Sequence, residues 1–507
     1  MRKHPFAFAL AAVAAIFASP AASAGPRIAL NVDGQANYSF NAPWANILGQ
    51  VDWTNQTYWT GYVDGQYKVT WGGSGTPSIT GSKSSFTVTG PGQGVLNLKH
   101  DTPTGGGLFT VLPNGVSNLN IQAPDAVAGT PFRKPFLDKV NAVAHNSVIR
   151  YMDWMQTVNS PVSTWSQRNT SPYQTMGEGV NYENIVALSN YTNADAWINI
   201  PAKANDDYIK NLAKFLKTNL KPGLKVYVEY SNELWNLGDQ MQGSYNMFQA
   251  RADAQFNSRS DDFGKSALRA AERLRQATEI FKTEFGGSSR LVPMIGGFIA
   301  NSYWSQWQID WLKGKGVNLT ADNYRMAIAP YVPGSEGDLG LTASDTKEQI
   351  IAKMYAFMNG SIKTWIKQNK AVAGGAGIGL DSYEAAAASF YAISNPVNQA
   401  LLPKFIELQS DPRIGQLYKD FINMWDVESG NGLFNAFGIA APYSQWGQFA
   451  LLNDINATGS VKYDAVLSFV GPVSTVPAPT VPVPEPATAG VLAVAAIAGL
   501  ARRTRRA

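Results

Sequence analysis

Lys225-Val-Tyr-Val-Glu-Tyr-Ser-Asn-Glu-Leu-Trp-Asn236 is the most informative stretch of this 507-residue chain. Valines and tyrosines alternate with other side chains up to Tyr230, and this period of two predicts a β-strand. The alternation stops at Ser231, and an amide and a carboxylate follow at Asn232 and Glu233. In a barrel of parallel strands, polar side chains at the carboxyl ends of the strands form the active site. Glu233 is therefore a candidate catalytic carboxylate.

Strand-like and helix-like segments alternate outward from this stretch, which is typical of βα units. Helical periodicity marks segments near 182–189, 205–222, 265–284, 346–368 and 414–428. Strand-like runs precede or separate these helices at 27–32, 147–154, 196–201, 291–298, 324–331, the approach to 383–384, and 433–437. With the strand before Glu233 the count reaches eight. The sequence therefore predicts an α/β fold, a (β/α)8 TIM barrel.

Residues 51–123 have a different composition, rich in Thr, Ser, Gly, Val and Trp, with short alternating runs. Such runs predict an antiparallel β-sandwich. We favour its insertion after the first barrel strand over a separate N-terminal β domain. The predicted divisions are a leader (1–24), the first barrel strand region (25–50), the β-sandwich subdomain (51–123), the barrel (124–465), a Pro/Val/Thr-rich linker (466–483) and a tail (484–507).

Both ends of the chain have the pattern of targeting segments. Residues 1–24 combine basic residues, an apolar run and an Ala-Ser-Ala cleavage site, which is typical of a secretory signal peptide. At the other end, Pro484-Glu-Pro486 precedes an apolar run of roughly 15 residues and four arginines. That run is short of the ~20 residues that cross a bilayer comfortably, and the arginines favour a cytoplasmic end.

The C-terminal tail resembles the PEP-CTERM sorting signal of Gram-negative bacteria. This resemblance implies a membrane sorting protease as a partner that cuts near Pro484-Glu-Pro486. It also implies export to the cell surface or the extracellular space, with a transient inner-membrane anchor. The alternative interpretation is a plain single-pass anchor.

Charge and composition exclude several classes of function. Residues 25–486 lack two basic side chains of the leader and the four C-terminal arginines, so the formal charge of +4 becomes −2 for this body. This slightly acidic body disfavours nucleic-acid binding. The chain has no cysteine and only three histidines, so disulfides, a cysteine nucleophile and a zinc site are not expected. The sequence implies no metal and no cofactor.

Several short motifs together resemble those of clan A glycoside hydrolases, which are TIM barrels. The resemblance is nearest to bacterial secreted proteins described as cellulose-binding or glycosidase-like, and it covers most of residues 125–452. The motifs are Arg150-Tyr-Met-Asp-Trp154, Trp197-Ile-Asn-Ile-Pro201, Asn232-Glu233, Ala329-Pro-Tyr331, Tyr383-Glu384 and Asp411-Pro-Arg-Ile-Gly415. The resemblance implies an acid/base glutamate at the end of strand four and a nucleophilic glutamate at the end of strand seven.

Glu233 is the acid/base candidate, and two glutamates compete for the role of nucleophile. Retaining hydrolysis of a glycosidic bond needs two carboxyl groups about 5 Å apart. Glu384 is in register with strand seven, although Tyr-Glu-Ala-Ala stands where the family has Tyr-Glu-Gly-Gly. Glu428 precedes Ser-Gly, as in other barrel glycosidases, but apolar residues at helical spacing place it near a helix end that Gly430 terminates. We prefer Glu384.

Five further residues are candidates for substrate binding, each with a structural alternative. The resemblance implies that Arg150 orients the nucleophile, and the alternative is an ion pair with Asp153. It also implies that Asn232 contacts a sugar hydroxyl, whereas an Asn there could simply form a turn. Tyr331, Trp446 and Trp197 could contact sugar, or could instead pack in or over the barrel core.

These observations predict a secreted retaining glycoside hydrolase that acts on a β-linked polysaccharide or oligosaccharide. The changed residues after Glu384 and the sorting tail support an alternative. In that alternative the barrel has lost catalysis and serves as a carbohydrate-binding or extracellular-matrix protein, since a fold can outlive its activity.

Overall fold

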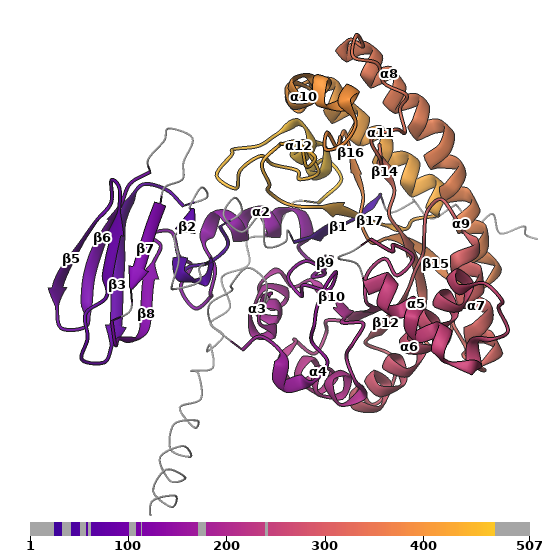
Figure 1. The fold of residues 1–507 in the computed structure, drawn as a ribbon, viewed down its shortest axis with the longest axis horizontal. Coiled ribbons are helices and arrows are strands. Elements are labelled where there is room, and N and C mark those ends of the chain that lie inside the picture. Colours follow the sequence, from indigo (N-terminus) through magenta and orange to yellow (C-terminus); the bar gives the residue numbers. More distant parts are fainter. Residues whose placement is uncertain are drawn as a thin grey trace, which may run out of the picture.

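The computed structural model describes residues 25–32, 42–50, 57–58, 62–100, 108–112, 114–170, 179–238 and 242–471. The predicted leader and sorting tail lie outside these residues. Eight parallel strands form one sheet in the order β15-β13-β12-β11-β10-β9-β1-β17 (Figure 1). They are β1 (Arg27–Asn31), β9 (Val148–Arg150), β10 (Asp195–Ile200), β11 (Val226–Tyr230), β12 (Leu291–Gly296), β13 (Arg325–Ile328), β15 (Gly379–Ser382) and β17 (Leu433–Phe437).

Hydrogen bonds between the two outermost strands, β15 and β17, close this sheet into a barrel. The Ser382 hydroxyl donates to the Leu433 carbonyl at 3.1 Å and accepts from the Asn435 amide at 2.8 Å. The Leu433 amide also donates to the Asp381 carboxylate at 2.8 Å. The predicted eight-stranded barrel is therefore confirmed. β10 begins one residue before its predicted run, and β15 forms in the Gly-rich approach to Tyr383-Glu384.

Helices pack around the barrel and bury their apolar faces against it (Figure 1). Asn205 caps α4 by accepting from the Tyr208 amide, and Gly430 ends α11 with a left-handed φ of 70°. The α-helices described are α2 (Lys134–Ala144), α3 (Tyr182–Thr192), α4 (Asp206–Asn219), α5 (Gln242–Ala252), α6 (Asp262–Phe285), α7 (Tyr303–Gly314), α8 (Lys347–Phe357), α9 (Lys363–Gly375), α10 (Pro396–Leu408), α11 (Pro412–Ser429) and α12 (Val461–Leu467).

One predicted helix is interrupted. The segment expected as a single helix over 346–368 contains a π-helical turn, η5 (Met358–Ile362), between α8 and α9. Strands β14 (Tyr331–Val332) and β16 (Ala386–Ala387) pair above the barrel, where they continue the sixth and seventh barrel strands. Both features shape the cavity described below.

Two antiparallel sheets lie beside the barrel (Figure 1) and follow β1 in the chain, before α2 and β9. They share one apolar core, which includes Tyr67, Val69, Leu96, Val111 and Ile121. This arrangement is the predicted β-sandwich in its inserted form. Its strands are β2 (Thr57–Tyr58), β3 (Gly65–Gly72), β4 (Ser78–Gly81), β5 (Ser85–Gly90), β6 (Gln93–Leu98), β7 (Leu108–Leu112) and β8 (Ser117–Gln122).

The described residues contain neither a helix suited to cross a membrane nor a cluster of side chains suited to hold a metal ion. None of the helices in the described ranges combines the length and the apolar character that crossing a bilayer requires. Among those same residues, no cluster of three or more His, Cys, Asp or Glu side chains could hold a metal ion.

Candidate active site

A cavity of about 840 Å³ opens at the carboxyl ends of the barrel strands and contains both predicted glutamates. Glu233 follows β11, and Glu384 lies two residues after β15. Nine of the other residues that line it are aromatic: Trp235, Phe298, Tyr331, Phe357, Trp365, Tyr383, Tyr391, Phe437 and Phe449. A concave, mostly apolar site with a few converging polar groups is the usual form of a small-molecule or glycan site.

The backbone after β11 turns sharply, so that neighbouring residues share one cavity. Ser231 and Glu233 have left-handed φ values of 61° and 44°, which are uncommon for residues other than glycine. The side-chain amide of Asn199 donates through Nδ2 to the Ser231 carbonyl at 2.8 Å and supports this turn. On a regular strand Asn232 and Glu233 would point to opposite faces, but here both line the cavity. Strained backbone of this kind concentrates at functional sites.

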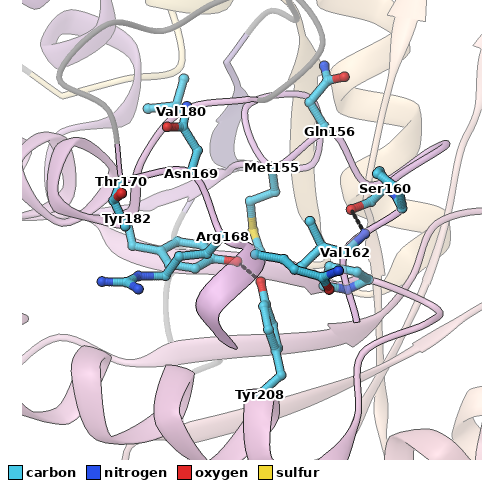
Figure 2. A pocket seen from close by; sticks show the side chains of 13 residues that line it. Met155, Gln156, Ser160, Val162, Arg168, Asn169, Thr170, Val180, Tyr182 and Tyr208 are labelled. Carbon is cyan, nitrogen blue, oxygen red and sulfur yellow. Dashed lines mark hydrogen bonds between the residues drawn. The ribbon is translucent and has the colours of Figure 1, made fainter. Parts of the chain in front are cut away.

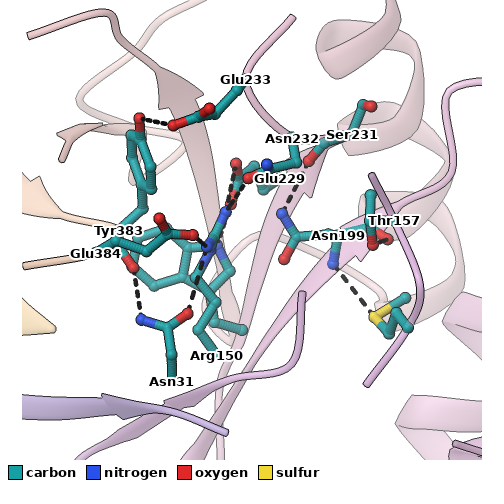
Figure 3. A network of polar contacts seen from close by, with 12 residues as sticks. Asn31, Arg150, Thr157, Asn199, Glu229, Ser231, Asn232, Glu233, Tyr383 and Glu384 are labelled. Carbon is teal, nitrogen blue, oxygen red and sulfur yellow. Dashed lines mark hydrogen bonds and ion pairs between the residues drawn. The ribbon is translucent and has the colours of Figure 1, made fainter. Parts of the chain in front are cut away.

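Arg150 lies at the centre of a buried polar network beneath the cavity (Figure 3). Its guanidinium donates through Nε and Nη2 to the Glu229 carboxylate, each at 3.0 Å. Nη1 donates to Glu384 Oε1 at 2.7 Å, and Nη2 donates to Asn232 Oδ1 at 2.8 Å. Burial opposes its positive charge, but Glu229 and Glu384 outweigh burial and raise the pKa of Arg150. Arg150 therefore stays charged and orients both Glu384 and Asn232.

Glu384 is held at both carboxylate oxygens. Arg150 binds Oε1, and the Tyr331 hydroxyl donates to Oε2 at 2.7 Å. Burial and the adjacent Glu384 raise the pKa of Tyr331 well above its usual value, so the phenol remains a donor. The two donors fix the orientation of this buried carboxylate. This environment suits a carboxylate that acts as a nucleophile.

Glu233 has the opposite environment. Burial, together with the nearby charge of Glu384, raises its pKa from the ordinary 4.5 to about 7. Hydrogen bonds from Tyr383 at 3.0 Å and Asn236 at 3.5 Å partly oppose this rise. One carboxyl group is thus protonated near neutral pH while the other is held by donors. Such a divergence separates an acid from a nucleophile in two-carboxylate sites.

Replacing Tyr383 with phenylalanine is expected to move the alkaline limb of the pH–activity profile upward. The Tyr383 hydroxyl donates to Glu233 Oε1 and lowers the pKa of that carboxyl. Without it the acid form persists to higher pH, by up to about one pH unit. The measurement is kcat/KM against pH on the polymer that the protein cleaves. Tyr391→Phe is the control, since that hydroxyl is not among the Glu233 partners that the structure describes. An alkaline limb that stays in place, or moves down, would contradict this role of Tyr383.

Glu428, the competing nucleophile candidate, lies near the end of α11 and away from the cavity lining. Its carboxylate pairs with Lys363 at 3.1 Å and Lys367 at 3.7 Å, both on α9. The preference for Glu384 therefore agrees with the geometry. Ala385 and Ala386, which stand where two glycines were expected, are fully buried where β16 pairs with β14 and Ala385 bridges to Ala436. Their small size is explained by packing.

Several predicted sugar contacts are wrong as direct contacts. Trp197 is fully buried inside the barrel, stacks on Tyr227 and donates to Glu229 Oε2 at 2.8 Å. Tyr227 and Tyr230 of β11 are likewise buried outside the cavity lining, whereas Trp235 lines it.

Two other candidates also lie outside the lining. Trp446 is 63% exposed in the segment after β17 and is absent from the cavity wall. Arg150 contacts Glu384 and Asn232 from below and does not itself reach the cavity. Its carboxylate partners are Glu229 and Glu384, in place of the ion pair that was considered with Asp153. Asn232 and Tyr331 do line the cavity, as predicted.

Sequence reasoning missed some residues that shape the site. Asn31, at the end of β1, accepts from Arg150 Nη1 at 3.3 Å and donates to the Tyr383 carbonyl at 2.8 Å. A polar residue that ends an apolar strand was the available signal. Tyr391 and Phe449 come from irregular segments without periodicity, so no local pattern marked them.

A second cavity of about 380 Å³ lies beside α3 and α4 (Figure 2). The hydroxyls of Tyr182 and Tyr208 hydrogen-bond to each other there, and Arg168 lies alongside them. The described residues that line it include no aspartate or glutamate. This second cavity therefore offers no pair of carboxylates among its described lining residues.

Comparison with solved structures finds glycoside hydrolases. The GH51 arabinofuranosidase from Xanthomonas axonopodis pv. citri is 14% identical, with a TM-score of 0.42, over 66% of this chain and 66% of that one. A psychrophilic family 10 endo-β-1,4-xylanase is 12% identical, with a TM-score of 0.35, over 66% of this chain and 91% of the xylanase. A GH5 xyloglucan-specific endo-β-1,4-glucanase from a metagenomic library is 13% identical, with a TM-score of 0.34, over 66% of this chain and 98% of the glucanase.

Comparisons by sequence give no match. No protein-family model matches the chain, and no curated protein matches it significantly. The chain spans 66% of the length of the arabinofuranosidase. The functional argument below therefore rests on the geometry of the site.

Proposed function

We propose that the protein is a retaining glycoside hydrolase that acts on a β-linked polysaccharide or oligosaccharide. The observation that carries this proposal is the pair of glutamates in one cavity with opposite environments. Burial and its neighbour raise the pKa of Glu233 to about 7, whereas Glu384 is bound at both oxygens by Arg150 and Tyr331. This division matches what double displacement requires of its two carboxyl groups.

In the first step, a Glu384 oxygen attacks the anomeric carbon and forms an ester while the glycosidic C–O bond breaks. Glu233 donates its proton to the departing oxygen. In the second step, Glu233, now a carboxylate, takes a proton from water as that water attacks the anomeric carbon and releases Glu384. Asn232, held by Arg150, lines the cavity with an amide suited to a sugar hydroxyl. These steps need no metal or cofactor.

Release of reducing sugar by the protein of residues 25–486 tests the proposal on a panel of β-glucan, xylan, mannan, galactan and bacterial exopolysaccharide. We expect activity on at least one polymer. Glu233→Gln keeps the shape of the side chain but cannot donate the proton, so activity on that polymer should fall by about 10²- to 10⁴-fold. A polymer cleaved equally by the wild type and Glu233→Gln would contradict the assignment of the acid.

A barrel that only binds carbohydrate is the alternative outcome of the same panel. It predicts no release from any polymer together with retained binding to one of them. The changed residues after Glu384 suggested this alternative, but Ala385 and Ala386 are buried against β17 and β14, and packing accounts for their small side chains. The enzyme is therefore the better-supported proposal.

We also propose that the protein is exported and reaches the cell surface or extracellular space of a Gram-negative bacterium. The support is the leader at 1–24 and the Pro-Glu-Pro tail at 484–507. A membrane sorting protease would act on the tail. Fractionation of cells that express the full chain, with and without residues 484–507, tests this proposal. Retention of the full chain in the cytoplasm would contradict it.

A further inference from the structure

The candidate active-site cavity continues beyond the two glutamates to a wall that α8, η5 and α9 form. Its lining runs from Tyr331 through Gly334, Ser335 and Asp338 to Phe357, Ile362 and Trp365. Neither Phe357 nor Trp365 belongs to the network around Glu233 and Glu384. The two rings meet edge to face, with centroids 6.0 Å apart and planes at 83°. We call this pair the aromatic corner.

The π-helical turn brings the two rings of the aromatic corner to one side of the helix. Phe357 and Trp365 are eight residues apart, and eight α-helical residues overshoot two turns by about 80°. A π-turn takes up one additional residue, which cancels most of that overshoot. Residues 358–362 form this turn between α8 and α9. Single π-turns in otherwise α-helical segments occur frequently at functional sites.

Contacts with the barrel fix the position of this wall. Asn369, which is fully buried on α9, donates to the Ile299 carbonyl at 2.8 Å, and Ile299 lines the same cavity. Ile362 is 2% exposed, whereas Phe357 and Trp365 are half-buried. The aromatic faces are therefore presented to the cavity on a rigid support, and rigid aromatic anchors lose little entropy on binding.

The charge of the cavity restricts the ligand that it can take. Asp153 and Asp338 line it in addition to the two glutamates, and the described lining residues include no Lys, Arg or His. The sequences 33–41, 171–178 and 239–241, which fall outside the described residues, also contain no Lys, Arg or His. An anionic sugar would enter this cavity against like charge and without a cationic partner.

We propose that the aromatic corner is a sugar-binding subsite for an uncharged ring of a β-linked glycan. The C–H face of a pyranose is apolar and would pack on Trp365, with Phe357 supporting the indole edge-on. A glycan that occupies both the catalytic glutamates and this corner extends over several sugar units. The inference rests on the proposed function, because it takes a glycan as the ligand of the cavity.

Binding to the Glu233→Gln variant tests the subsite separately from cleavage. Calorimetry would measure its affinity for cellohexaose, xylohexaose, laminarihexaose and β-1,4-mannohexaose, and for the hexamer of β-1,4-mannuronate as the anionic counterpart of mannohexaose. We expect at least one neutral hexasaccharide to bind and the mannuronate hexamer to bind more weakly than mannohexaose. Adding Trp365→Ala to Glu233→Gln should lower the affinity for the tightest-binding hexasaccharide at least about tenfold, as the loss of an aromatic anchor does.

Two further variants separate stacking from loss of structure. Trp365→Phe keeps an aromatic face and should restore most of the affinity. Trp307, on α7, is also a half-buried tryptophan; it packs under Arg259 and lies outside the cavity lining. Trp307→Ala should therefore leave binding unchanged.

Three results would overturn the inference. These are unchanged affinity in Trp365→Ala, tighter binding of the mannuronate hexamer than of mannohexaose, and no binding of any hexasaccharide. Reducing-sugar release by the wild-type protein judges the proposed function independently. If the wild-type protein cleaves a polymer but Trp365→Ala leaves the hexasaccharide affinity unchanged, the subsite is refuted while the proposed function stands.

Discussion

Glu384→Gln is expected to lower kcat by at least about 10⁴-fold on whichever polymer the protein cleaves, with the fold retained. An amide is too weak a nucleophile to form the glycosyl ester. Its carbonyl oxygen can still accept from Arg150, while its NH2 group takes the place of the oxygen that accepts from Tyr331, whose hydroxyl can turn to accept instead. Steady-state rates of reducing-sugar release, with circular dichroism as the check on folding, provide the measurement.

Glu428→Gln is the matched control for this prediction. Glu428 is the other glutamate with a nucleophile-like sequence context, but it pairs with Lys363 and Lys367 at the outer end of α11. Its replacement should change kcat by less than about twofold, because exposed and half-exposed ion pairs contribute little. A large loss in Glu428→Gln together with a small loss in Glu384→Gln would reverse the assignment.

Arg150→Met is expected to destabilise the protein by about 3–5 kcal/mol, because it leaves buried carboxylates without their cation. Glu229 is 4% exposed and Glu384 is 6% exposed, and both form ion pairs with Arg150. Activity should also be lost, since neither Glu384 nor Asn232 would keep its guanidinium partner. Urea-induced unfolding followed by tryptophan fluorescence measures the stability of each variant.

A double variant shows whether unpaired charge is the cause. Adding Glu229→Gln to Arg150→Met removes one of the stranded carboxylates and should recover part of the lost stability. Arg150→Lys keeps the charge without the planar fork and should fall between the wild type and Arg150→Met. A change of less than about 1 kcal/mol in Arg150→Met would contradict a central role for this network.

Periodicity was sufficient to predict the barrel, because each strand keeps its own apolar pattern whatever its neighbours do. It located Glu233 for the same reason, whereas Glu384 was placed by the family resemblance and by counting back from the strand at 433–437, because a Gly-rich segment precedes it. The left-handed turn at Ser231 and Glu233 could not be predicted, because nothing local distinguishes it from a simple end of the strand. That turn is what allows Asn232 and Glu233 to share one cavity.

Errors arose where three-dimensional packing overrides local pattern. Trp197 was a candidate sugar contact with core packing as the alternative, and the β10 register selects the alternative by placing it inside the barrel against Tyr227. The position of Trp365 beside Phe357 could not be predicted, because a regular α-helix would place the two residues on different faces. Only the π-turn at 358–362 brings the two rings together, and helical periodicity carries no signal for such a turn.

Covalent trapping tests the central claim most directly, since that claim is that Glu384 becomes esterified during turnover. The protein would be incubated with a 2-deoxy-2-fluoro glycoside, bearing a good leaving group, of the sugar that it releases. Proteolysis and mass spectrometry would then locate the added mass. The account predicts one sugar attached to Glu384, and no adduct in Glu384→Gln. An adduct on any other residue, or an α-anomer as the first product from a β-linked substrate, would contradict it.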